Sequence, residues 1–147
     1  MGQFSVSTFI NRSQQDVFDF LSDPAIKHKW MPMVESAAWT SSGEPGVGST
    51  VEAIVEMGGK ETEMQFEITQ WDVPNRYDYK ILTVMFPMKA MAHSFRLEPA
   101  DGGTRVSQVG EFEMISILRF AAGLMAKIAT RMNQNELNTL KQLLEAG

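Results

Sequence analysis

The stretch that decides the fold is "SILRFAAGLMAKIATRMNQNELNTLKQLLEA" at residues 116–146, the longest helical pattern in the chain. It has no proline and one glycine, and its apolar residues recur at the spacing of one helix face, at positions 117, 120, 121, 124, 125, 128 and 132. Leu140, Leu143 and Leu144 leave this stripe, so we predict curvature or a bend near Asn133–Asn135. Such a helix needs a large apolar surface to cover, and the rest of the chain must supply that surface.

Seven segments before this helix alternate between apolar and polar residues, as β-strands do. They lie at residues 4–10, 34–40, 49–57, 61–68, 76–86, 88–97 and 104–114. Short turns join most of them, and Gly58-Gly59 and the Asp-Gly-Gly of 101–103 are strong hairpin signals. The connections are short enough for antiparallel neighbours, so the segments predict one antiparallel sheet with a single buried face.

Two short helices separate the first strand from the second. Ser13 can cap the helix of "SQQDVFDFLSD", whose Val17, Phe18 and Leu21 form an apolar stripe. Pro24 then suits the first position of a second helical turn. The whole pattern predicts an α+β protein in which a curved seven-stranded antiparallel sheet wraps around the long C-terminal helix, and we expect a single domain over residues 1–147.

The amino-acid composition excludes some classes of function. The net charge of −5 argues against a nucleic-acid binder that relies on clustered Lys and Arg, and the absence of cysteine excludes disulfides and thiolate chemistry. The N-terminus does not have the pattern of a signal peptide, and no apolar run approaches the roughly 20 residues that span a bilayer. We therefore expect a cytoplasmic protein with no transmembrane segment and no nucleic-acid partner, while a homodimer stays open.

The chain resembles the START and polyketide-cyclase-like superfamily of helix-grip proteins (SRPBCC), which includes the major pollen allergens. The matching stretches are "NRSQQDVFDFLSDPAIKHKWMPMV" at 11–34, "PGVGSTVEA" at 45–53, "ITQWDVPNRYDYKI" at 68–81 and "DGGTRVSQVGEFE" at 101–113. The resemblance as a whole covers nearly the whole chain, and its matching stretches identify a fold, not a reaction. The resemblance implies the helix-grip fold and an internal cavity between sheet and long helix that binds small apolar or lipid-like molecules.

The inward positions of the predicted strands and helix supply residues that can line such a cavity. The chain has eleven methionines, and flexible methionine suits either an adaptable pocket or a gap in an ordinary core. The predicted ligand-binding residues are Trp30, Met57, Met64, Phe66, Tyr79, Met85, Met88, Met91, His93, Phe95, Gln108, Phe112, Leu124, Ile128 and Met132. Pro87 interrupts the pairing of two strands, so we expect a flexible apolar gate near residues 85–91.

His93 shares its strand face with Met91 and Phe95, which points its ring toward the interior. There it can contact a ligand or act as an acid or base, with Tyr79 as a proton donor. The alternative is a histidine that hydrogen-bonds to Tyr79 or Gln108 and takes part in no chemistry. His93 and Tyr79 are therefore the candidate catalytic residues if the protein is an enzyme.

Other polar patterns give weaker signals. The glutamates at 52, 56, 61, 63 and 67 project from the wet face of two strands, without the loop or the histidine spacing of a metal site. No phosphate-binding loop, serine nucleophile elbow or zinc-protease motif occurs, so we expect no metal and no cofactor. Arg119, Lys127 and Arg131 form a basic stripe that is either a solvated helix back or a contact for a membrane surface or partner.

These observations lead to three hypotheses. The first is binding or transport of a small, mainly hydrophobic molecule in the cavity. The second is an enzyme of the cyclase or dehydratase kind that uses His93 and Tyr79. The third is a partner-binding module that uses the exposed face of the long helix or the 85–91 hairpin, and such a module should show an exposed apolar patch and little internal void.

Overall fold

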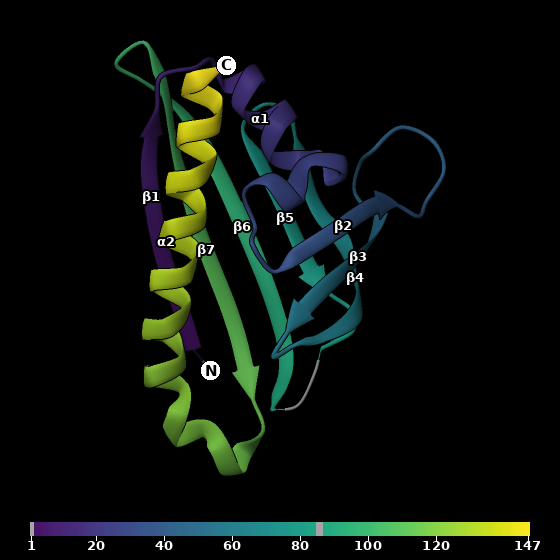
Figure 1. Cartoon of the computed structure of the whole chain (residues 1–147). Coiled ribbons are helices and arrows are strands. Elements are labelled where there is room, and N and C mark those ends of the chain that lie inside the picture. Colours follow the sequence, from purple (N-terminus) through teal and green to yellow (C-terminus); the bar gives the residue numbers. More distant parts are fainter. Residues whose placement is uncertain (1, 85–86) are drawn as a thin grey trace.

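A computed structural model describes residues 2–84 and 87–147. The elements in chain order are β1 (Gly2–Ile10), α1 (Gln14–Ser22), η1 (Pro24–Lys29), β2 (Val34–Trp39), β3 (Thr50–Met57), β4 (Lys60–Asp72), β5 (Arg76–Ile81), β6 (Met88–Ala100), β7 (Gly103–Met114), η2 (Ser116–Ala121) and α2 (Ala122–Ala146). The strands form one antiparallel sheet in the order β1-β7-β6-β5-β4-β3-β2. The sheet curves around α2, which packs along β1, while α1 and η1 lie toward the other side of the concave face (Figure 1). The predicted helix-grip fold, with seven strands and two short helices after the first strand, is confirmed.

Side-chain caps fix the short helices as the sequence predicts. The Ser13 hydroxyl accepts a hydrogen bond from the Asp16 amide at 3.2 Å and begins α1. The Asp23 carboxylate accepts one from the Ala25 amide at 3.0 Å, and Pro24 occupies the first position of η1. These caps hold η1, a 3-10 helix, against the open side of the sheet's concave face.

The inner face of the sheet is built by strict alternation. Val51, Ala53 and Val55 of β3 are buried, whereas the intervening positions are half-buried or exposed. Gly58 and Gly59 adopt φ values of 60° and 78°, the left-handed conformation that a two-residue hairpin between β3 and β4 requires. The turn chemistry and the alternation thus set the register that brings one residue in two to the concave side.

The long helix buries a different face from the one that its N-terminal pattern predicts. Phe120 and Leu124 are 83% and 63% exposed, whereas Leu137 and Leu140 are fully buried. The first six residues of the predicted helix form the 3-10 helix η2, and within the continuous α2 Leu124 stands nearly opposite Leu137 and Leu140. The α-helix is unbroken through residues 133–135, and the chain changes direction at the junction of η2 and α2 instead (Figure 1).

Among the residues that the structure describes, no helix is long and apolar enough to cross a membrane.

The two halves of α2 should respond very differently to truncation of leucine. We expect Leu140→Ala to lower the free energy of unfolding by about 2–5 kcal/mol, because it removes a fully buried side chain and leaves a cavity. Leu124→Ala should change it by less than about 0.5 kcal/mol, because that side chain is already in water. Urea unfolding of both variants measures this, and equal losses would contradict the assignment of the buried face.

Candidate functional site

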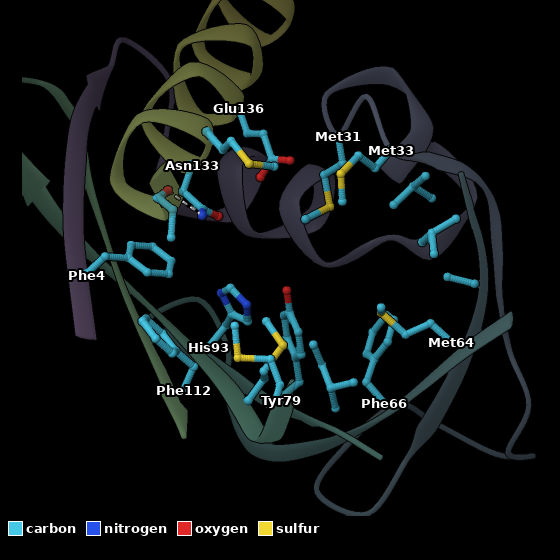
Figure 2. Close-up of a pocket in the computed structure, with 18 of the residues that line it drawn as sticks. Phe4, Met31, Met33, Met64, Phe66, Tyr79, His93, Phe112, Asn133 and Glu136 are labelled. Carbon is cyan, nitrogen blue, oxygen red and sulfur yellow. Dashed lines mark hydrogen bonds between the residues drawn. The ribbon is translucent and has the colours of Figure 1, made fainter. Parts of the chain in front are cut away.

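A cavity of about 310 Å³ lies between the concave face of the sheet, η1 and the middle of α2. Figure 2 shows its labelled side chains facing one another across an open space, with Met31 and Met33 opposite Met64 and Phe66. Its wall is mainly apolar and includes seven of the eleven methionines, namely Met31, Met33, Met64, Met88, Met91, Met125 and Met132. The size and lining are typical of sites for small organic molecules.

Nine of the predicted ligand-binding residues lie in this wall. They are Met64, Phe66, Tyr79, Met88, Met91, His93, Phe112, Ile128 and Met132. Period-two alternation places the sheet residues there together, except Met88, which an irregularity in the pairing of β6 separates from the alternation of Met91 and His93. The predicted gate is described only in part, since Met85 and Phe86 lie outside the described residues.

Five other predicted residues do not line the cavity. Trp30 and Phe95 are buried in the core instead, where their rings meet edge to face at 6.4 Å. Gln108 is buried behind His93, and Met57 stands at the end of β3, beside the hairpin and beyond the cavity. Leu124 faces outward, because it stands nearly opposite the buried Leu137 and Leu140 on α2. An inward position is therefore not sufficient for a place in the wall.

The structure also places polar residues in the wall that the strand pattern does not predict. Lys27 comes from η1, and Asn133 and Glu136 come from α2. A signal for Lys27 was present, because a 3-10 helix repeats every three residues and so puts Pro24, Lys27 and Trp30 on one side. All three of these residues are buried.

Lys27 is the most unusual member of the wall. Its residue is 1% exposed, and its Nζ has no hydrogen-bond partner in the described part of the chain. Four aromatic rings surround Nζ with centroids 5.4–5.7 Å away, those of Trp30, Phe66, Tyr77 and Tyr79. Burial lowers the pKa of Lys27 to about 8, against the opposing pull of Glu136 and Asp23.

Glu136 is the acidic counterpart of Lys27 in the same cavity. Its burial raises the pKa of the carboxyl to about 7, and the positive charge of Lys27 opposes that rise. No ion pair within 4.0 Å joins the two side chains. The cavity therefore contains a carboxyl group that titrates near neutral pH and an amine that faces no acceptor.

His93 is held by a short polar network and also faces the cavity (Figure 2). The Gln108 side-chain amide donates to His93 Nδ1 at 3.1 Å and to Asn133 Oδ1 at 3.0 Å, which leaves the proton of the neutral ring on Nε2. Burial, and then the charge of Lys27, lower the pKa of His93 to about 4. The ring is therefore neutral at pH 7 and acts there as a hydrogen-bond donor.

Tyr79 stands beside His93 on the cavity floor. The two rings are stacked with centroids 5.2 Å apart, and the Tyr79 hydroxyl points into the open space (Figure 2). Burial raises the pKa of Tyr79 above its ordinary value, so its hydroxyl keeps its proton. Tyr79 and His93 thus present two neighbouring neutral donors to a polar group of a ligand.

The predicted acidic cluster lies away from the cavity, on the opposite face of the sheet. Glu56 pairs with Glu61 across the β3–β4 hairpin, and Glu35 of β2 is close to both. A hydrogen bond to Glu61 raises the pKa of Glu35 to about 7. Within residues 2–84 and 87–147, no group of three or more His, Cys, Asp or Glu side chains has the arrangement of a metal site.

The burial of Lys27 should give the stability of the protein a specific pH dependence. Its pKa is about 8 when folded and close to its ordinary 10.5 when unfolded, so between these values the unfolded chain binds more protons. Stability should therefore rise with pH across this window, by at most about 3 kcal/mol for this group. The variant Lys27→Met should lack that rise and be more stable at neutral pH, because it removes an unpaired buried charge.

Urea unfolding from about pH 7 to about pH 10 measures this difference. Both proteins should carry Glu136→Gln, so that the cavity carboxyl does not titrate in either one. If the free energies of unfolding of the two proteins changed with pH in the same way, the prediction would be wrong, and the aromatic rings would compensate fully for the burial of the ammonium ion.

The comparisons with known proteins agree with this geometry. The solved structure of a START superfamily protein from Mycobacterium smegmatis has 13% sequence identity and a TM-score of 0.82, and covers 99% of each chain. The Zhui aromatase/cyclase from Streptomyces sp. R1128 has 15% identity and a TM-score of 0.80 over 97% of this chain and 93% of that chain. The solved structure of Ara h 8.0201 has 16% identity and a TM-score of 0.78 over 99% of this chain and 98% of that chain.

At these identities the likeness to solved structures is one of fold. No curated protein matches the chain in sequence at a significant level. A family model described as "Polyketide cyclase / dehydrase and lipid transport" matches residues 1–145. The chain therefore belongs to the polyketide cyclase/dehydrase and lipid transport family, and the resemblance drawn from its sequence is confirmed.

Proposed function

We propose that this protein binds a small, mainly apolar molecule with a polar group in the cavity between sheet and α2. The observation that carries this proposal is the cavity wall itself, in which seven methionines and several aromatic rings surround a few polar side chains. Binding would be driven by burial of apolar surface. About 200 Å² of buried ligand surface provides about 5 kcal/mol, before the costs of ordering ligand and side chains.

Methionine makes this wall adaptable. Its side chain has three rotatable bonds and a polarizable sulfur, so a wall of methionines can follow ligands of different shape. The polar groups would then set the orientation of the ligand, with Tyr79 and His93 donating hydrogen bonds from the sheet side. Asn133 and Glu136 face them from α2 (Figure 2).

The test of this proposal is saturable binding of a neutral apolar probe, N-phenyl-1-naphthylamine, followed by its fluorescence. We expect one site per chain and a loss of at least about tenfold in affinity for Ala129→Phe, because Ala129 lines the cavity and a benzyl group would fill it. The matched control is Leu124→Phe on the same helix, which faces outward and should bind the probe as the wild type does. No saturable binding, or equal loss in both variants, would overturn the proposal.

A second candidate function is proton transfer to or from a bound ketone, as a cyclase or dehydratase requires. The observation in its favour is that Glu136, with a pKa of about 7, shares the cavity with the neighbouring donors Tyr79 and His93. Glu136 would remove a proton beside the carbonyl, and the two donors would stabilise the enolate oxygen. The pKa of about 4 makes His93 a donor in this scheme and not the base.

Exchange of the protons next to the carbonyl of an apolar ketone in heavy water, followed by NMR, tests the second candidate. We expect Glu136→Gln and Tyr79→Phe each to slow the exchange at least about tenfold while leaving binding of the neutral probe unchanged. Exchange at the rate of free ketone in the wild-type protein would remove this candidate and leave the binding function in place.

A partner-binding module is a weaker explanation. Ile117 and Phe120 of η2 and Leu124 of α2 are exposed, as such a module requires. The cavity, however, is the internal void that this hypothesis does not expect. We further propose, from the lack of cysteine and the acidic net charge, a single cytoplasmic domain without nucleic-acid partners, and we leave dimerisation open.

A further inference from the structure

Lys27 is a buried cation that apolar binding by itself does not need. A side chain such as methionine would fill the same space without the cost of desolvating an ammonium group, which amounts to several kcal/mol when no acceptor is supplied. The four surrounding rings recover part of that cost through cation–π attraction, at centroid distances near the outer limit of about 6 Å for such contacts. The position of Lys27 in the cavity wall therefore suggests that its amine has a chemical role toward a bound molecule.

The surroundings of Nζ are those of a reactive amine. Nζ is buried and has no hydrogen-bond or ion-pair partner among the described residues, and Lys27 is one of the residues that line an apolar cavity able to hold a carbonyl compound. A lysine that is desolvated in this way loses its proton readily and becomes a nucleophile. Glu136 lines the same cavity and can carry a proton at neutral pH.

We propose that Lys27 forms an imine with an apolar aldehyde or ketone held in the cavity. This inference rests on the proposed binding function and names a class of molecule for it. The lone pair of neutral Nζ attacks the carbonyl carbon, and a proton moves from nitrogen to the former carbonyl oxygen to give a carbinolamine. The Glu136 carboxyl group then protonates the hydroxyl, which leaves as water while the C=N bond forms, and addition of water reverses the sequence.

The sequence of steps balances without a further reactant. An amine and a carbonyl compound give an imine and water, and the proton that Glu136 lends is returned when the protonated imine loses its own proton. Tyr79 and His93 present their donors to the same cavity and can stabilise the oxygen of the carbinolamine. Every group that the reaction requires thus lies in one wall.

At pH 7 a larger fraction of the amine is neutral, and so able to attack a carbonyl, in Lys27 than in the surface lysines. With a pKa of about 8, roughly a tenth of the Lys27 amine is neutral at pH 7, whereas an ordinary lysine at about 10.4 is neutral in fewer than about one molecule in a thousand. The charged and titratable groups that act on it are Glu136 of α2, Asp23 before η1, and His93 of β6. The two carboxyl groups oppose the loss of the proton, and burial outweighs them.

Reductive trapping tests the proposal directly. The whole protein is incubated at about pH 7 with decanal and cyanoborohydride, and the labelled lysines are found by peptide mass spectrometry. We expect Lys27 to be alkylated at least about tenfold faster than Lys29, an exposed lysine two residues away that serves as an internal reference. Glu136→Gln should slow labelling of Lys27 at least about tenfold relative to labelling of Lys29 in the same molecules.

Two variants complete the experiment. Lys27→Arg keeps a cation in the cavity but cannot form an imine, and Lys27→Met removes the charge; both should lose the fast label, while Lys29→Met should keep it. If the neutral probe binds but Lys27 is labelled no faster than Lys29, the imine proposal is wrong and the binding function stands. If neither probe binding nor fast labelling occurs, both proposals fail.

Discussion

The structure depends on one packing contact, the burial of Leu137, Leu140 and Leu144 of α2 against the core beneath the sheet. These three leucines fix the C-terminal half of the helix along β1. The more N-terminal part of α2 borders the cavity instead, through Met125, Ile128, Ala129 and Met132. The cavity is the space that remains, so the same contact that stabilises the fold also sets the place and size of the site.

Burial beside the mainly apolar cavity changes the acid–base behaviour of three polar residues in its wall. Burial lowers the pKa of Lys27 and of His93 and raises that of Glu136, because each shift favours the neutral form. At the surface these three groups would be strongly solvated, and a lysine and a glutamate there would be fully charged near pH 7. In the cavity, small changes in surroundings decide their charge, and arrival of a ligand is one such change.

The sheet and the short helices were predictable from the sequence because each depends on a local rule. Alternation fixed the inward residues of the strands, glycine pairs marked a hairpin, and Ser13 marked the start of α1. The buried face of α2 was not predictable from its first turns, because Leu124 and the buried Leu137 and Leu140 stand on nearly opposite sides of the same α-helix. The packing of Leu140 in the core then determines which face of α2 is buried.

The site was predictable only in part, for the same physical reason. Residues such as Met91 and His93 follow from strand alternation, whereas Phe95, two positions further along the same face, is sealed in the core by its neighbours. Alternation predicts which side of the sheet a side chain faces, but not how far that side chain lies from the cavity. Lys27 and Glu136 lie on helices and are charged, so a search for apolar inward positions passes over them.

Buried polar atoms without partners gather near Lys27 and His93, two residues of the cavity wall. Those found among the described residues are Lys27 Nζ, Trp30 Nε1, Tyr77 Oη and Gln108 Oε1. The rings of Trp30 and Tyr77 both face Lys27, at 5.6 and 5.4 Å, and Gln108 holds His93. Folding alone favours cores in which such atoms are paired or replaced, so their gathering at one place opposes stability. Several unpaired buried polar atoms close to one cavity are not explained by stability alone. They suggest a role toward a ligand, and here they lie around Lys27.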